Sequence, residues 1–316
     1  MTNKIAFLFP GQGSQAVGMG RELAERFPVA AQTFAEADAA LGFPLSRLCF
    51  EGPEENLRLT ENTQPAIMTV SVAAARVLAE HGVEPALAAG HSLGEWSAHV
   101  IAGTLSFADA VRAVKARGAA MQKAVPPGEG AMAAVLALDA APVAEACAEA
   151  ARETGLTVQA ANLNSPGQTV ISGAAAAVEK ASAICKAKGA RRAVMLPVSA
   201  PFHCALMQPA QEEVARVLAG IAMHDPRIPV AANVTGGLVT TADATRDALI
   251  RQVTGAVRWV DCVQSLKTAG ADLYIEVGPG KVLCGLLKQI DPELRSLNVE
   301  DAASLEKTLT ELKAVD

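Results

Sequence analysis

The chain has 316 residues, of which 51% are hydrophobic, 19% are charged and 3% are aromatic, and its formal net charge is −6. A half-apolar chain of this length can bury a sizeable core in one large or two ordinary domains, so the composition excludes a disordered protein. The acidic balance and the few aromatic residues argue against nucleic-acid binding, which needs positive charge and stacking surfaces.

The six cysteines are scattered and form no CxxC pair. We therefore expect reduced, mostly buried thiols and no metal site or disulfide framework. No stretch of about 20 uncharged apolar residues could span a bilayer. Residues 1–9 lack the longer apolar stretch and cleavage site of a secretory signal. We expect a cytoplasmic protein that does not act at a membrane.

Strand-like apolar runs alternate with helical patterns, which is typical of an α/β fold with a largely parallel sheet. In the first part of the chain, the predicted strands are residues 5–9 and 86–89, and the predicted helices are residues 21–41, 65–82, 95–102 and 107–123. Pro65 is expected to begin its helix, because the first helical position needs no backbone N–H. Ser106 is expected to cap the helix of residues 107–123, with Asp109 at the capping-box position.

A proline- and glycine-rich stretch at residues 126–130 predicts a domain boundary. Beyond it, the pattern predicts strands at residues 131–138, 156–161, 168–172 and 192–196, and helices at residues 142–153 and 174–188. The order along the chain is strand, helix, strand, strand, helix, strand. This order is typical of a ferredoxin-like domain. Strand and helix patterns then resume at residues 228–232, 242–253, 272–277 and 281–289. We therefore predict a larger α/β domain of residues 1–126 and 198–316, with a smaller α+β domain of residues 127–197 inserted into it.

A candidate nucleophile lies in Gly90-His91-Ser92-Leu93-Gly94, which matches the G-x-S-x-G pattern between a predicted strand and a predicted helix. A sharp turn of this kind exposes the serine hydroxyl, and the following helix offers free N–H groups to a developing oxyanion. The alternative is a serine that only caps the helix after a buried strand.

Two other glycine-rich segments do not support a nucleotide cofactor. The segment Gly11-Gln12-Gly13-Ser14 lacks the third glycine of a dinucleotide fingerprint, and no P-loop is present. The segment Gly278-Pro279-Gly280 is interpreted as a tight strand-to-helix connection. We expect no cofactor and no bound metal.

A serine nucleophile needs a base, and His203 is the best placed of five histidines. It begins an apparent helix after a strand, where a side chain can project from the carboxyl edge of the sheet. His81 and His224 are expected to be exposed, His91 to face away from Ser92, and His99 to lie too far along its helix. The alternative is a surface or capping role for His203.

Arg117 lies at the edge of the apolar stripe of the predicted helix 107–123, about 40° from Met121 at about 100° per residue. An arginine that faces the interior needs an anion, because an unpaired buried charge costs several kcal/mol. The planar guanidinium suits a carboxylate held by two parallel hydrogen bonds. That carboxylate belongs either to an internal Asp or Glu or to a substrate.

At this point the chain resembles the malonyl-CoA:acyl carrier protein transacylases of bacterial type II fatty acid synthesis, over essentially its whole length. The resemblance rests on the serine motif, which continues to Glu95, and on Arg117 with Met121. It also rests on a set of further motifs along the chain: Phe9-Pro10-Gly11-Gln12-Gly13-Ser14-Gln15, Thr63-Gln64-Pro65-Ala66, Asn162-Leu163-Asn164-Ser165-Pro166-Gly167-Gln168, residues 198–207 around His203, Gln252, and Glu276-Val277-Gly278-Pro279-Gly280. Several motifs in the right order are far more specific than any one of them. The resemblance implies an α/β-hydrolase-like larger domain.

The resemblance also implies catalytic roles. Ser92 would carry the malonyl group as an ester, and His203 would be the base. Gln12 and the backbone N–H of Leu93 would stabilise the oxyanion, while the main-chain carbonyl of Gln252 would orient the histidine.

For the substrate, the resemblance implies that Arg117 binds the free malonyl carboxylate and that Gln64 and Met121 line the same pocket. A phenylalanine at position 202 resembles the residue found in the malonyl-selecting members. Its ring would crowd a methyl branch on the substrate. Two departures from the family are Trp96, where tyrosine or phenylalanine is usual, and Thr254-Gly255-Ala256, where Asn-Pro usually follows the glutamine. The second departure leaves the position of the Gln252 carbonyl open.

The implied reaction transfers a malonyl group from malonyl-CoA to the phosphopantetheine thiol of acyl carrier protein. Three alternatives stay open: a serine hydrolase or thioesterase, a non-catalytic subunit of a larger synthase, and the transacylase of a malonate decarboxylase complex. We expect a monomer. The basic segment of residues 186–192 is a candidate for docking an acidic carrier protein, or else a cationic helix end favoured by the helix dipole.

Overall fold

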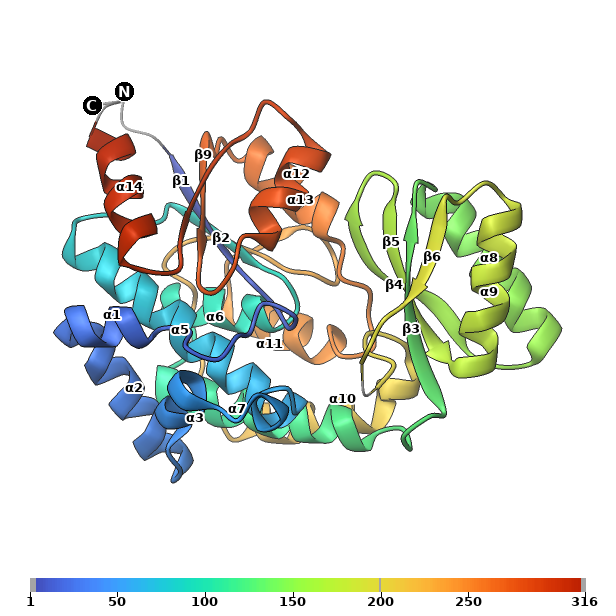
Figure 1. Cartoon of the computed structure of the whole chain (residues 1–316), viewed down its shortest axis with the longest axis horizontal. Helices are drawn as coiled ribbons and strands as arrows, with labels where there is room; N and C mark the ends of the chain where they lie inside the picture. The colour runs from blue at the N-terminus through green and yellow to red at the C-terminus, as the bar shows by residue number, and fades with distance from the viewer. Residues whose placement is uncertain (1–3, 199, 314–316) are drawn as a thin grey trace.

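The computed structural model describes residues 4–198 and 200–313, so the expectations for residues 1–3 and 314–316 and the Ser199 position of the histidine motif lie outside the described residues. Two separate sheets organise the chain (Figure 1). The larger sheet has the order β10-β9-β1-β2-β7-β8 and is parallel except for the β7–β8 pair. Its strands are β1 (Ile5–Phe9), β2 (Leu87–Gly90), β7 (Val230–Ala231), β8 (Leu238–Val239), β9 (Leu273–Val277) and β10 (Arg295–Val299). The predicted α/β class with a largely parallel sheet is confirmed.

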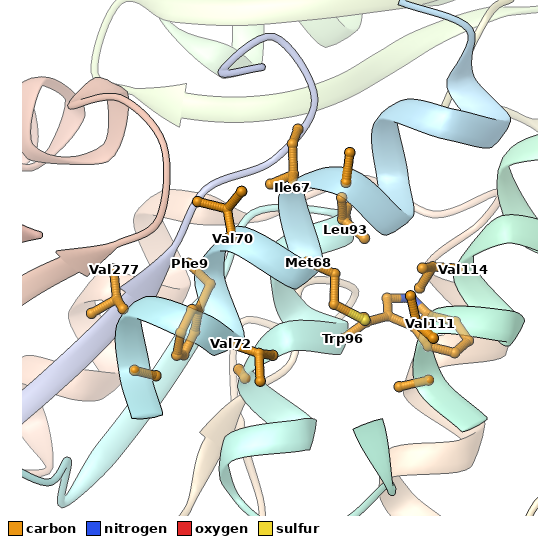
Figure 2. Close-up of a cluster of buried hydrophobic side chains, with 14 of the residues drawn as sticks. Phe9, Ile67, Met68, Val70, Val72, Leu93, Trp96, Val111, Val114 and Val277 are labelled. Carbon is orange, nitrogen blue, oxygen red and sulfur yellow. The ribbon is translucent and has the colours of Figure 1, made fainter. Parts of the chain in front are cut away.

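Helices cover both faces of this sheet. Side chains alternate along each strand, so each face contributes its own buried cluster. In β1, Phe7 and Phe9 belong to one buried cluster, and Ala6 and Leu8 belong to another. The first cluster includes residues of α5 (Thr60–Glu80), α6 (Leu93–Ile101) and α7 (Phe107–Lys123), as Figure 2 shows. The second cluster is built with α12 (Trp259–Thr268) and α13 (Val282–Ile290).

The smaller sheet is antiparallel, with the order β4-β5-β3-β6, and carries two helices. Its elements are β3 (Gly130–Leu136), α8 (Ala140–Thr154), β4 (Val158–Ser165), β5 (Gln168–Ala174), α9 (Ala175–Ala187) and β6 (Arg192–Met195). They follow one another in the predicted order. The predicted strand 156–161 is too short, since β4 continues to Ser165 through two irregularities in its pairing with β5.

Strand β4 also joins the two sheets. The carbonyl of Val257, in the segment before α12, accepts the backbone N–H of Leu163 at 2.9 Å, and the N–H of Val257 donates to the carbonyl of Ala161 at 2.8 Å. These bonds fix the smaller sheet beside the carboxyl edge of the larger one.

Two prolines lie where the observed helices depart from the predicted ones. The helix expected at residues 21–41 is interrupted, giving α1 (Arg21–Arg26) and α2 (Pro28–Leu41). A residue before proline disfavours the helical conformation, and Phe27 is extended. Pro65 lies inside α5 and not at its first position, because the helix begins at Thr60.

The prediction of the helix 107–123 is confirmed by α7, and Ser106 Oγ accepts the N–H of Asp109 as expected. Several other elements of the larger part of the chain match the predictions within a few residues, including α11 (Ala242–Arg251). Elements without a specific prediction are α3 (Leu45–Glu51), α4 (Glu54–Leu57), the 3₁₀ turn η1 (Ala205–Met207), α10 (Gln208–Ala219), β8, α12, β10 and α14 (Ala302–Lys313).

All six cysteines are free and five are buried, as expected. Within residues 4–198 and 200–313, no helix is both long and apolar enough to cross a bilayer.

Candidate active site

The turn of residues 90–94, which we call the elbow, connects β2 to α6 and holds Ser92 at a positive φ of 51°. Both flanking glycines are required by space. A Cβ on Gly90 would lie 1.9 Å from the carbonyl carbon of Gly94, and one on Gly94 would lie 2.0 Å from the carbonyl oxygen of Phe9. The elbow therefore packs directly against the end of β1, and the strain at Ser92 is held by close backbone contacts.

Asn233, after β7, fixes the elbow from both sides. Its Oδ1 accepts the backbone N–H of Ser92 at 2.7 Å, and its Nδ2 donates to the carbonyl of Gly90 at 2.7 Å. The side chain is fully buried. The two bonds satisfy backbone groups that the sharp turn leaves without regular partners.

His203 approaches Ser92 from the segment that leaves the smaller sheet. Its Nε2 lies 2.7 Å from Ser92 Oγ, and its Nδ1 lies 2.9 Å from the carbonyl oxygen of Gln252. A carbonyl can only accept, so Nδ1 carries the proton and Nε2 accepts the Ser92 hydroxyl. The expectation that His203 begins a helix is wrong, because it lies in a turn with φ 59° before η1.

The electrostatic environment keeps His203 neutral. Burial, and secondly the charge of Arg117, lower the pKa of His203 to about 3, although its hydrogen bonds to the carbonyls of Gln252 and Gly255 act in the opposite direction. The imidazole is therefore an unprotonated base over the physiological pH range.

Arg117 of α7 is almost completely buried and faces the same serine. Its Nη2 donates to Ser92 Oγ at 3.0 Å and to Gln252 Oε1 at 2.9 Å, and its Nη1 donates to Gln64 Oε1 at 2.8 Å. These three partners are neutral, and no carboxylate lies within ion-pair distance of the guanidinium among the described residues. Burial lowers the pKa of Arg117 to about 10, so the group is still charged at neutral pH.

The remaining predicted site residues lie at different distances from this centre. Gln64 bridges Arg117 and Met121, since its Nε2 lies 3.8 Å from Met121 Sδ. Phe202 is buried next to His203. The exposed Gln12 donates to Thr60 Oγ1 at 3.3 Å and makes no hydrogen bond to Ser92, although its loop touches the elbow, because a Cβ on Gly11 would lie 2.5 Å from the carbonyl of His91.

The N–H of Leu93, the first residue of α6, has no acceptor within the part of the chain that the structure describes. It is available to a ligand at the helix N-terminus, next to the serine hydroxyl. This is the geometry in which a backbone N–H can stabilise an oxyanion.

Comparison with known proteins assigns nearly the full length of the chain to one family. Residues 6–312 match the family model described as "Acyl transferase domain". The malonyl CoA-acyl carrier protein transacylase of Salmonella typhimurium is 51% identical over 98% of this chain and 99% of its own. The chain belongs to the malonyl CoA-acyl carrier protein transacylase family.

Solved structures of related transacylases agree with this assignment. An acyl carrier protein S-malonyltransferase from Vibrio cholerae has a TM-score of 0.94 and 50% identity, covering 96% of this chain and 99% of the other. A malonyl-transacylase solved in complex with its type II PKS acyl-carrier protein has a TM-score of 0.94 and 48% identity, covering 98% and 99%.

The two departures from the transacylase family have local explanations. Trp96 is fully buried in the first turns of α6, where Figure 2 shows it among the side chains of α5 and α7. In Thr254-Gly255-Ala256, the Gly255 carbonyl lies 3.2 Å from His203 Nδ1. The changed sequence leaves the Gln252 carbonyl in hydrogen-bond range and adds a second acceptor beside it.

Sequence reasoning missed two buried polar residues of this site, Asn233 and Glu95. The signal for Glu95 was a carboxylate in the otherwise apolar start of the helix after Ser92. The signal for Asn233 was weaker, a single polar residue directly after the predicted strand 228–232. His91, expected to face away, bonds Asn164 Oδ1 at 2.9 Å through its Nε2.

Proposed function

We propose that this chain transfers a malonyl group from malonyl-CoA to the phosphopantetheine thiol of an acyl carrier protein, through a malonyl ester on Ser92. One observation carries the proposal: Ser92 Oγ is within hydrogen-bond distance of both a neutral imidazole and a guanidinium that lacks a carboxylate partner. The imidazole suits activation of the hydroxyl, and the guanidinium suits a substrate that brings its own carboxylate.

In the first half-reaction, Ser92 Oγ attacks the thioester carbonyl while its proton passes to His203 Nε2. The tetrahedral oxyanion is stabilised by the free N–H of Leu93, with Gln12 as the second donor. Loss of one such donor costs roughly 10²–10³ in rate. The C–S bond then breaks, and the proton on His203 passes to the departing CoA thiolate.

In the second half-reaction, the carrier thiol gives its proton to His203 and attacks the malonyl ester, and Ser92 leaves with that proton. Arg117 has to exchange its hydrogen bond to Ser92 Oγ for the malonyl carboxylate. The exchange also matters for the base, because the Arg117 charge lowers the pKa of His203 and the carboxylate offsets that charge. A substrate with the right carboxylate thus improves the base that activates it.

Mass spectrometry after brief exposure to malonyl-CoA tests the proposal. The protein should gain about 86 Da, the mass of a malonyl group added as an ester, and a Ser92→Ala variant should gain nothing. The adduct should persist in water and disappear when holo carrier protein is added. Rapid loss of the adduct to water would instead support a hydrolase, and no adduct at all would support a non-catalytic subunit.

We place the carrier-protein contact on the basic segment of residues 186–192. Lys188 lies 3.5 Å from Glu145 and 3.9 Å from Glu149, which takes up part of its charge. Arg191 and Arg192 are exposed. Reversal of their charge should raise KM for the carrier protein and not for malonyl-CoA, because rim charges act mainly on encounter with the partner. Parallel changes in both values would contradict this docking site.

Further parts of the proposal rest on the sequence. The element order supports an α/β-hydrolase-like larger domain (1–126 and 198–316) and a ferredoxin-like smaller one (127–197). The reaction as written uses only side chains, backbone groups and the two thioester partners, so we propose no cofactor or metal. A cytoplasmic location and a monomer stay predictions. The alternative role in a malonate decarboxylase complex differs only in the carrier, so a panel of carrier proteins separates the two.

A further inference from the structure

Glu95, in the first turn of α6, is a fully buried carboxylate in the interior behind the catalytic serine. Its Oε2 accepts the backbone N–H of Asn233 at 3.0 Å and the side-chain N–H of Gln252 at 2.6 Å. Its Oε1 has no hydrogen-bond partner among the described residues. A buried carboxylate with one unused oxygen is costly, so a local structural role does not explain it well.

The side chain of Gln252 connects Glu95 to Arg117. Its Nε2 donates to Glu95 and, at 2.9 Å, to the carbonyl of Ser92, while its Oε1 accepts Arg117 Nη2 at 2.9 Å. A glutamine amide has one donating end and one accepting end, so a carboxylate on one side fixes which end faces the guanidinium. The main-chain carbonyl of the same residue accepts His203 Nδ1.

The two buried charges are therefore separated by one amide. Arg117 has three neutral partners, and its Nε has none among the described residues. Glu95 is the carboxylate whose charge acts on Arg117, and the effect is mutual. At this separation in a buried site, opposite charges interact appreciably without direct contact.

We propose that Glu95 is a positioning residue that serves as the internal counter-charge of Arg117, acting through the Gln252 amide, and so limits how tightly the site holds a malonyl carboxylate. This inference rests on the proposed malonyl transfer. In the free enzyme, Glu95 balances Arg117. When the substrate carboxylate arrives, it competes with Glu95 for the same cation, which keeps the malonyl ester from becoming a stable end point.

A transacylase has to release its acyl group as readily as it accepts it. Uniformly tighter binding of substrate and intermediate lowers KM without raising kcat, and overstabilising the ester slows its transfer. The counter-charge therefore predicts an unusual phenotype: its removal should improve apparent substrate binding and impair turnover.

The Glu95→Gln variant tests this. The glutamine carbonyl can accept the same two N–H groups that Glu95 Oε2 accepts, so the hydrogen bonds are kept and the charge is lost. At pH 8, where Glu95 is mostly ionised, we expect KM for malonyl-CoA to fall by about threefold to tenfold, and discharge of the malonyl ester by carrier protein to slow by about tenfold, since 1.4 kcal/mol corresponds to a factor of ten. KM for acetyl-CoA, which has no free carboxylate, should not fall.

Glu276→Gln is the matched control. Glu276 is also fully buried, and it accepts the backbone N–H groups of Leu283 and Cys284 at the start of α13. A general effect of neutralising a buried glutamate would appear in both variants. A KM for malonyl-CoA that rises or stays unchanged in Glu95→Gln, or a fall of equal size in Glu276→Gln, would overturn the proposal.

A second measurement needs no variant. Burial raises the pKa of Glu95 to about 7, against the hydrogen bonds and the Arg117 charge that lower it. Arg117 and Cys262 interact electrostatically with Glu95, and His203 is connected to it through Gln252. Arg117 has a pKa of about 10, Cys262 a pKa raised by burial and His203 a pKa of about 3, so none of them titrates between pH 6 and 8.

Protonation of Glu95 as the pH falls should release Arg117 for the substrate. KM for malonyl-pantetheine, which lacks the titrating phosphates of CoA, should therefore decrease from pH 8 to pH 6, and acetyl-pantetheine should show no such decrease. A flat malonyl profile would count against Glu95. If wild-type protein forms no malonyl ester at all, the proposed function fails; if it forms one and both tests are negative, only the role of Glu95 fails.

Discussion

The larger sheet contains two strand-to-helix turns that look alike in sequence and differ in use. The elbow joins β2 to α6, and Gly278-Pro279-Gly280 joins β9 to α13, both at the carboxyl edge of the sheet. Both need glycine: a Cβ on Gly278 would lie 2.2 Å from Ser71 Oγ, nearly as close as the 1.9 Å and 2.0 Å contacts at the elbow. Tight glycine turns alone therefore do not identify the reactive one.

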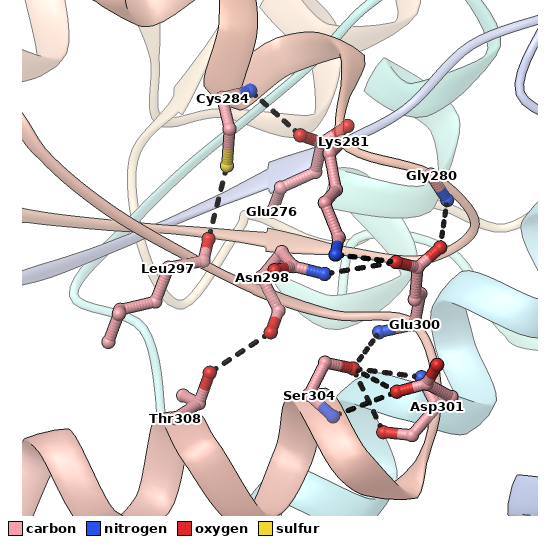
Figure 3. A network of polar contacts seen from close by, with 10 residues as sticks. All are labelled: Glu276, Gly280, Lys281, Cys284, Leu297, Asn298, Glu300, Asp301, Ser304 and Thr308. Atoms are coloured by element: carbon pink, nitrogen blue, oxygen red, sulfur yellow. Dashed lines mark hydrogen bonds and ion pairs between the residues drawn. The ribbon is translucent and has the colours of Figure 1, made fainter.

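The difference lies at the N-termini of the two helices. In α13, Glu276 reaches forward from its own strand and accepts the N–H groups of Leu283 and Cys284 at 3.0 Å and 2.7 Å. Figure 3 shows the bond to Cys284 within a larger polar network. The neighbouring Gly280 N–H donates to Glu300. The positive end of α13 is thus occupied by the protein's own carboxylates, which stabilise the turn and leave no place for an anion.

In α6 the corresponding position is open. Ser92 is the N-cap residue and makes no capping hydrogen bond, and the Leu93 N–H has no acceptor in the described part of the chain. The carboxylate nearest in sequence, Glu95, points to Gln252 and Asn233 instead. The N-terminus of α13 is bonded to the protein's own carboxylates, and the N-terminus of α6 is left available for the oxyanion of the proposed reaction. Substitutions on the two sides should therefore separate activity from stability.

The largest effect is expected for His203→Ala. Removal of the base should lower kcat by roughly 10²–10⁴, the usual contribution of a positioned general base. KM for malonyl-CoA should change little, because the imidazole contacts Ser92 and not the substrate carboxylate. Steady-state transfer assays with the exposed His81→Ala as control check this. A variant with normal kcat would remove His203 from the mechanism.

Arg117→Ala should shift the substrate preference of the protein from charged to uncharged acyl groups. Loss of the guanidinium would remove the hydrogen bonds that we propose it makes to the malonyl carboxylate, so kcat/KM for malonyl-CoA should fall by about 10² relative to acetyl-CoA. The exposed Arg112 of the same helix, as Arg112→Ala, is the control. Equal losses for the two substrates would show that Arg117 supports the fold and does not select the substrate.

The features of the site that the sequence predicts are those with a local signature. The elbow follows from five residues between a strand and a helix, and the inward face of Arg117 follows from helical periodicity alone. Ser106 and Asp109 predict where α7 begins for the same reason. In these three cases the deciding residues lie within one turn or one helix. His203, 111 positions from Ser92, is instead inferred from its place after a predicted strand.

The parts that could not be predicted depend on contacts across the chain. Asn233 supports the elbow from 141 positions beyond Ser92, and its role exists only because β7 pairs with β2. Glu95 is near Ser92 in sequence, but its partner Gln252 is 157 positions away. Pro65 illustrates the same limit for secondary structure, because packing of α5 in the core outweighs the local preference of proline for a first position.

Asn233→Ala should weaken both stability and turnover, unlike Glu276→Gln. Alanine leaves the part-buried Ser92 N–H and the buried Gly90 carbonyl without partners, and a buried group that loses its partner costs about 1–3 kcal/mol. Because these bonds also hold the strained φ of Ser92, kcat should fall by about tenfold. Glu276→Gln should lose about 1–2 kcal/mol at the α13 N-terminus and keep kcat within about twofold. Urea unfolding and transfer assays on both proteins compare them.

Equal kcat in these two variants would mean that the elbow keeps its geometry without Asn233. In that case the close backbone contacts of Gly90 and Gly94 would be sufficient to hold the serine.

The smallest effect concerns His99, which lies on α6 behind the open turn and takes no part in the proposed reaction. It is fully buried, and burial lowers its pKa to about 3. The unfolded chain protonates this histidine near pH 6.5 and the folded chain does not, so its contribution to stability is lost as the pH falls below about 6.5. The loss should reach about 2 kcal/mol by pH 5.

Because Glu95, with its raised pKa, changes the stability in the opposite direction as the pH falls, the total stability of the wild type is a poor measure of the His99 effect. The difference between wild type and His99→Gln isolates the effect: the gap between their free energies of unfolding should narrow, or reverse, by about that amount between pH 7 and pH 5. Parallel pH profiles for the two proteins would mean that the His99 site admits enough water to accept the proton.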